Sequence, residues 1–140
     1  MSTLPSPVAL LPHRPPFLFI DTAVELTDGD AACEGTFEPD ALIFTGHFPG
    51  NPVVPGVLLL EGMAQTLAYW AHHHHPGHEV LLSGADKARF RRLVRPGERI
   101  RYRITVERQL MGEVHARAVA EVDGKRAATA LVKGHLTPRA

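Results

Sequence analysis

Hydrophobic residues in this 140-residue chain recur at two spacings, and each spacing predicts a different kind of element. Between residues 99 and 106 every second side chain is apolar, which is the period of a strand with one buried face. The same alternation, together with turn signals such as Asp123-Gly124, predicts further strands. The predicted strands cover residues 17–26, 31–38, 80–92, 99–110, 114–122 and 127–136.

A long helix is predicted between the second and third of these strands. Pro55 suits the first turn of a helix, where its missing N–H costs nothing, and Pro76-Gly77 ends the apolar segment after His75. The segment is apolar on nearly every face, so this helix must be enclosed by other elements. Residues 1–16 are rich in proline and are predicted to be an irregular N-terminal segment with one helical turn. Residues 45–55 are also rich in proline and are predicted to form a rigid loop.

The order of two strands, one enclosed helix and four further strands predicts one α+β domain over residues 1–140. A single antiparallel sheet curled around the central helix satisfies this order, although the pattern does not specify the winding. The composition agrees with this prediction, because 44% hydrophobic and 21% charged residues are typical of a globular chain.

The formal net charge is zero, but the charges are divided unevenly along the chain. Residues 1–70 carry eight acids and one base, whereas residues 71–140 carry seven acids and fourteen bases, so the halves have charges of −7 and +7. The basic half favours a partner with an acidic surface. Nucleic acid fits less well, because no aromatic residues that could stack on bases alternate with these cations.

Other features restrict the compartment. The single cysteine, Cys33, excludes an internal disulfide and a thiolate-rich metal site. Residues 1–16 lack the basic start and unbroken apolar core of a signal peptide. Residues 53–71 are long enough to cross a bilayer, but Glu61 near their middle argues against a membrane span. We therefore expect a cytoplasmic protein.

The candidate chemistry lies where the rigid loop meets the helix. His47 stands in this loop, and Glu61 is the one carboxylate inside the apolar helix. An unpaired carboxylate that is buried favours its protonated form, while histidine can act as a base near neutral pH, so the two can form an acid–base pair. Gly56 and Val57 place free N–H groups at the helix start, suited to a developing oxyanion. The alternative is a structural histidine and a glutamate paired with an arginine.

The segment that contains these residues reads GHFPGNPVVPGVLLLEGMAQ over residues 46–65. It resembles the (3R)-hydroxyacyl-acyl-carrier-protein dehydratases of type II fatty acid synthesis, whose pattern is G-H-F-P-G-x-P-x-x-P-G-V-L-x-x-E-x-x-A-Q. Agreement extends to LPHRPPFL at residues 11–18, to DKARFRR at residues 86–92 and to VDGK at residues 122–125. The resemblance therefore covers nearly the whole chain.

This resemblance implies a hot-dog fold, a homodimer that can assemble as a trimer of dimers, and active sites at the dimer interface. His47 is then the catalytic base, and Glu61 of the partner subunit is the acid that protonates the departing hydroxyl group. Gly56 N–H holds the thioester carbonyl, and Gln65, one helical turn beyond Glu61, orients the acid. Glutamate rather than aspartate at position 61 favours dehydration without isomerisation, and the reaction needs no cofactor.

The resemblance also identifies a partner for the basic half of the chain. Acyl carrier proteins are acidic, and a docking surface is predicted from five cations, whereas Arg99, Arg101 and Arg103 are expected to form a solvated strand face. The docking cations are Lys87, Arg89, Arg91, Arg92 and Arg95.

Alternatives remain within and outside this enzyme class. The same dehydration could serve a polyketide or specialised-lipid pathway, and a non-catalytic acyl-binding hot-dog subunit is the alternative from another class. Val54, where many members have methionine, leaves the preferred acyl chain length open. The histidines at positions 72–75, with His78, are outside the family pattern, and no metal site is predicted there because acidic and thiolate companions are missing.

Overall fold

The computed structural model describes residues 3–139 and contains the predicted order of two strands, a long helix and four strands. Two short helical segments precede the long helix. In chain order the elements are α1 (Pro7–Leu10), β1 (Thr22–Leu26), β2 (Asp30–Thr36), the 3-10 helix η1 (Leu42–Thr45), α2 (Gly56–His74), β3 (His78–Phe90), β4 (Arg99–Leu110), β5 (Glu113–Val122) and β6 (Lys125–Pro138).

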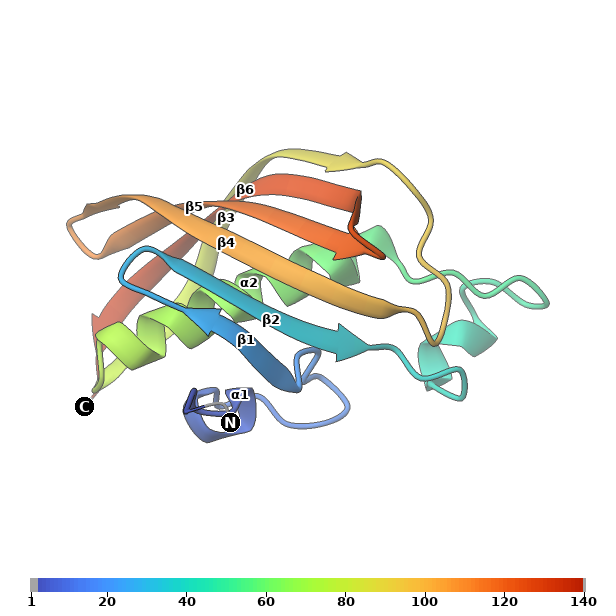
Figure 1. Cartoon of the computed structure of the whole chain (residues 1–140), viewed down its shortest axis with the longest axis horizontal. Helices are drawn as coiled ribbons and strands as arrows, with labels where there is room; N and C mark the ends of the chain where they lie inside the picture. Colours follow the sequence, from blue (N-terminus) through green and yellow to red (C-terminus); the bar gives the residue numbers. More distant parts are fainter. Residues whose placement is uncertain (1–2, 140) are drawn as a thin grey trace.

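The six strands form one antiparallel sheet in the order β1-β2-β4-β5-β6-β3. Figure 1 shows this sheet curling over α2, with the loop that precedes α2 extending beyond one end of the sheet. The arrangement confirms the α+β prediction and the hot-dog fold that the resemblance implies. It leaves β1 and β3 as edge strands, and β3 is the longer of the two.

The prediction of a strand from residue 17 was wrong for residues 17–21, because β1 begins at Thr22. Backbone groups in this segment bond to the helix: the Gln65 side chain accepts a hydrogen bond from Phe19 N–H and donates one to the Phe17 carbonyl. The segment also crosses close to Gly35 of β2, where a Cβ atom would lie 1.8 Å from the Phe19 carbonyl oxygen. Phe17 and Phe19 therefore hold Gln65 in place, and β1 begins only at Thr22.

Helix α2 is enclosed as predicted, since it contacts α1 and the strands β2 to β6. Its side chains from Leu67 to Ala71 are all buried. The closest approach is at Gly62, where a Cβ atom would lie 2.2 Å from Cζ of Tyr102 on β4. Glycine at position 62 therefore lets the helix lie against the ring of a fully buried tyrosine.

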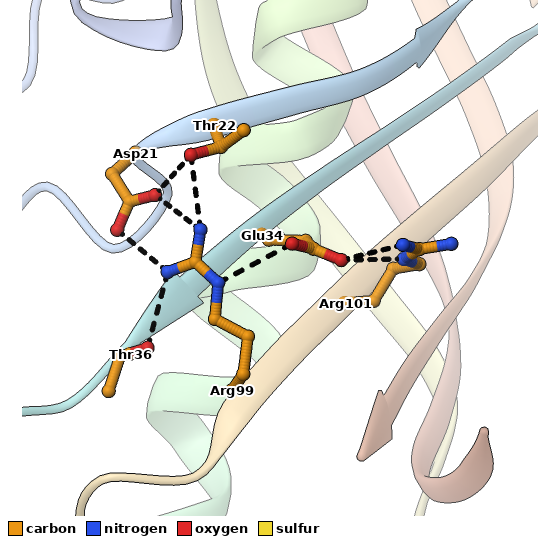
Figure 2. Close-up of polar contacts among 6 residues, drawn as sticks. All are labelled: Asp21, Thr22, Glu34, Thr36, Arg99 and Arg101. Atoms are coloured by element: carbon orange, nitrogen blue, oxygen red, sulfur yellow. Dashed lines mark hydrogen bonds and ion pairs between the residues drawn. The ribbon is translucent and has the colours of Figure 1, made fainter. Parts of the chain in front are cut away.

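The two oppositely charged halves of the chain meet where β4 pairs with β2. Figure 2 shows Arg99 bonded to Asp21 and Glu34, while Arg101 also bonds to Glu34. Arg103 pairs with Glu25 of β1. Arg99 and Arg101 lie exposed on the outer face of the sheet, as expected for a solvated strand face, and all three arginines pair there with carboxylates of the acidic half.

Candidate active site

The loop that carries His47 is held at several points. His47 N–H bonds to the carbonyl of Ile43 in η1, and Val53 N–H bonds back to the His47 carbonyl. A further bond from Val54 N–H to the Val94 carbonyl ties the loop to the segment between β3 and β4. The guanidinium group of Arg95 donates to the Asn51 side chain at 2.8 Å. The loop is therefore fixed to the body of the fold on both sides of His47.

The His47 imidazole is held in one tautomer. Its Nδ1 lies 2.8 Å from the Val53 carbonyl oxygen, which can only accept, so Nδ1 carries the proton in the neutral ring. The ring stacks on Phe48, with centroids 4.0 Å apart. Nε2 consequently keeps its lone pair and can accept a proton.

The start of α2 lies beside the end of β3. A Cβ atom on Gly56 would lie 2.9 Å from Cε1 of Phe90, so the glycine lets the Phe90 ring cover the first turn of the helix. Val57 is 69% exposed. The first N–H groups of a helix have no partner inside it, so Gly56 and Val57 can offer donors to a polar group of a ligand.

Glu61 differs from the unpaired, buried carboxylate that the helix pattern predicted. Its side chain is 21% exposed, and its Oε2 accepts a hydrogen bond of 3.0 Å from Gln65. The His13 Nε2 atom lies 3.8 Å from the same oxygen. Glu61 therefore faces a cavity with polar neighbours, which explains how a carboxylate is accommodated in an otherwise apolar helix.

The structure brings together only some of the predicted site residues within one chain. Gln65 contacts Glu61, whereas His47 and Glu61 form no hydrogen bond or ion pair with each other within residues 3–139. The cavity beside Glu61, of about 150 Å³, is bounded instead by His13, Gln65 and residues 80–82 of β3. One chain by itself therefore presents the histidine and the acid at separate places.

The five cations of the predicted docking surface are in different environments. Lys87, Arg89 and Arg91 are exposed and have no salt-bridge partner in the described part of the chain. Arg92 pairs with Glu98 at 2.8 Å, and Arg95 is bonded to the His47 loop. Lys87 and Arg91 line a groove on the outer face of the sheet together with Arg117 and Arg126. The last two cations were not predicted from the sequence.

Two of the histidines that follow Ala71 contact protein acceptors. The Nε2 atom of His74 lies 2.9 Å from the Thr27 carbonyl, and that of His75 lies 3.2 Å from the Gln109 side chain. Among residues 3–139, no three His, Cys, Asp or Glu side chains are placed to hold a metal ion. No helix in the same range is long and apolar enough to span a membrane.

Three features of the site were not assigned from the sequence: the Val53 carbonyl, the Phe90 ring and His13. A backbone carbonyl and a ring that covers a glycine leave no signal in a sequence pattern. His13 does lie within a segment that matches the family, LPHRPPFL, but nothing in the sequence places it beside a carboxylate 48 positions later.

Two solved structures share this fold. The dehydratase heterocomplex ApeI:P from Xenorhabdus doucetiae superposes with a TM-score of 0.82 at 16% identity, covering 96% of this chain and 92% of that chain. A hypothetical thioesterase with coenzyme A from Streptococcus pneumoniae TIGR4 superposes with a TM-score of 0.65 at 10% identity, covering 84% and 85%. Both likenesses show the hot-dog fold alone.

Sequence comparison is more specific. A family model described as a FabA-like domain matches residues 11–131. The 3-hydroxyacyl-[acyl-carrier-protein] dehydratase FabZ of Chloroflexus aggregans is 46% identical over 82% of this chain and 82% of its own length. The FabZ of Ligilactobacillus salivarius is 40% identical over 86% and 89%. The chain therefore belongs to the FabA-like family, in its group of FabZ-type dehydratases.

Proposed function

We propose that this chain dehydrates (3R)-3-hydroxyacyl groups on acyl carrier protein to trans-2-enoyl groups in fatty acid biosynthesis. Its FabZ relatives are named for this class of substrate. The observation that carries the proposal is the bond between His47 Nδ1 and the Val53 carbonyl, because it leaves Nε2 as a base. The helix start offers N–H groups close by in the chain, and Glu61 offers an acid.

In the proposed reaction, His47 Nε2 removes a proton from the carbon next to the thioester. The negative charge that develops on the thioester oxygen is stabilised by Gly56 N–H, with Val57 N–H beside it. Glu61, held by Gln65, gives its proton to the β-hydroxyl group, which leaves as water. The histidine ends protonated and the glutamate ionised, so protons balance and no cofactor takes part.

We propose that each site is completed by a second copy of the chain, paired along β3. This strand has a free edge of 13 residues, with Leu81 65% exposed and Leu82 49% exposed. Its last residue, Phe90, lies beside Gly56, while its first half lines the cavity at Glu61. Antiparallel pairing about a twofold axis sets these two ends against each other, so His47 meets Glu61 of the partner subunit.

The activity is tested with 3-hydroxybutyryl acyl carrier protein, following the ultraviolet absorbance of the enoyl thioester. We expect turnover by the unaltered protein and a loss of at least about a hundredfold in the His47→Ala variant with an unchanged circular dichroism spectrum. Wild-type rates in that variant would contradict the catalytic role of His47, and an inactive parent protein would contradict the proposed dehydratase activity.

The shared site is tested by mixing two variants. His47→Ala and Glu61→Gln are each expected to be inactive, but subunit exchange in an equal mixture forms heterodimers with one intact site. The mixture should then regain about a quarter of the parent activity, because half of the dimers are mixed and each has one site. If both residues act within one chain, the mixture stays inactive.

We propose that the acidic carrier docks over Lys87 and Arg91, with the other cations of the groove that they line. Reversal of both to glutamate should raise the Michaelis constant for the carrier-bound substrate, and added salt should reduce the difference. Arg108 and Lys125 are exposed cations outside this groove, so their reversal is a matched control. Equal effects of the two pairs would contradict docking there.

We also propose that the dimers assemble as a trimer of dimers and that the protein is cytoplasmic.

A further inference from the structure

His13 is a titratable side chain next to the proposed catalytic acid that has no role in the reaction described above. Its Nε2 atom lies 3.8 Å from Glu61 Oε2, and both side chains line the same cavity. The His13 side chain is 25% exposed, so solvent reaches it. Its other ring nitrogen, Nδ1, is buried and has no hydrogen-bond partner among residues 3–139.

Gln65, the other polar neighbour of Glu61, cannot exchange protons with it. Its carbonyl oxygen accepts from Phe19 N–H, and its amide nitrogen donates to Phe17 and to Glu61. Every hydrogen of this amide is therefore used, and an amide does not titrate. Among the groups that line the cavity, His13 is the one that brings a ring nitrogen able to carry a proton within 4 Å of the Glu61 carboxylate.

The geometry suits transfer in the direction of Glu61. A carboxylate only accepts hydrogen bonds, so attraction between the two side chains requires a proton on His13 Nε2. A movement of about 1 Å brings the two atoms to hydrogen-bond distance. His13 lies in the irregular segment between α1 and β1, and the cavity leaves room for this movement.

We propose that His13 is a positioning residue that returns a proton to Glu61 after each turnover, an inference that rests on the proposed function. Dehydration leaves Glu61 ionised. The N–H bond at Nε2 of the His13 imidazolium then breaks as an O–H bond forms at Glu61 Oε2, which leaves a neutral imidazole that takes a new proton at Nε2 from solvent through the cavity. His47 releases to solvent the proton that it took from the substrate, so the cycle balances.

Other charged and titratable groups surround this pair. His72 of α2 and Lys133 of β6 lie on the two elements packed against it, and Arg139 follows β6. These groups disfavour a second positive charge, and burial, with Arg139 and His13 nearby, lowers the pKa of His72. His72 therefore tends to stay neutral, so it adds no further positive charge beside His13.

The test uses His13→Gln, which keeps a donor but does not titrate, and His13→Ala. Both are expected to lower kcat about tenfold to a hundredfold with little change in KM. Free imidazole in the buffer should restore much of the kcat of His13→Ala, because the small base can occupy the space left by the side chain. His135→Gln, which removes an exposed histidine paired with Glu113, is the control and should neither lose activity nor respond to imidazole.

Unchanged kcat in His13→Gln overturns the proposal, and so does a loss in both variants without imidazole rescue, which indicates a structural role. If His13→Ala does not fold, His13→Gln is assayed for a kcat loss that grows as the pH rises and buffer protons become scarce. A loss independent of pH then overturns the relay. The proposed function fails separately, if the unaltered protein does not dehydrate the carrier-bound substrate.

Discussion

The imidazole Nδ1 of His47 lies 2.8 Å from the carbonyl oxygen of Val53, six positions later in the same loop. This contact forms only if the backbone is fixed both at His47 and after Val53, and different residues fix these two points. Ile43 anchors the His47 backbone, and Val94 anchors the backbone after Val53. Arg95 fixes the turn between them through Asn51 and Pro52. The direction of the histidine therefore depends on residues more than forty positions away.

Arg95→Leu is expected to loosen this loop and to lower kcat about tenfold, because a small displacement of a catalytic group has a large effect on rate. The loss should be the same with a substrate on free pantetheine as with one on the carrier protein. Arg108→Leu, an exposed arginine elsewhere, is the matched control. A defect confined to carrier-bound substrate would show that Arg95 docks the carrier instead.

Gly62→Ala should destabilise the fold strongly. The added methyl group would lie 2.2 Å from Cζ of Tyr102, whose ring is fully buried, so ring or helix must shift. Overpacking of this kind costs about 1–3 kcal/mol, measurable as a lower midpoint in urea unfolding. Gly29→Ala meets no atom within 4 Å and is the control. Similar midpoints for the two variants would contradict the packing argument.

Cys33 should not react in the folded protein. Burial raises the pKa of its thiol to about 12, although a hydrogen bond with Thr66 opposes this shift. At pH 8 only about one thiol in ten thousand is then ionised. A chromogenic disulfide reagent should label no thiol in native protein and one per chain in denaturant. Rapid labelling without denaturant would show that β2 opens readily.

Acid should weaken the fold through His72. Burial, and then the charges of Arg139 and His13, lower the pKa of this side chain below its usual 6.5. Below about pH 6.5 the unfolded chain takes up the proton first, so the free energy of unfolding falls as the pH falls. His72→Gln should flatten this slope between pH 7 and 5 in urea titrations. The same variant compared at pH 8, where His72 is neutral in both states, is the control.

Much of this protein was predictable from local patterns. Alternation located the strands, continuous apolarity located an enclosed helix, and the spacing of His47, Gly56 and Glu61 pointed to the chemistry. The predictions of strands and helix succeeded because period, turn residues and helix ends depend on neighbours in the chain, whereas the roles of His47, Gly56 and Glu61 stay predictions. The end of the proline-rich loop at Gly56 was predictable for the same reason.

Only the tertiary structure determined the contacts between distant segments. It set the strand order, delayed the start of the first strand to Thr22 while Gln65 binds Phe17 and Phe19, and paired the arginines of β4 with carboxylates of the acidic half. It also placed His13 beside Glu61 and left the edge of β3 free. Such contacts join residues dozens of positions apart, and the sequence pattern carries no record of them because they arise from packing in three dimensions.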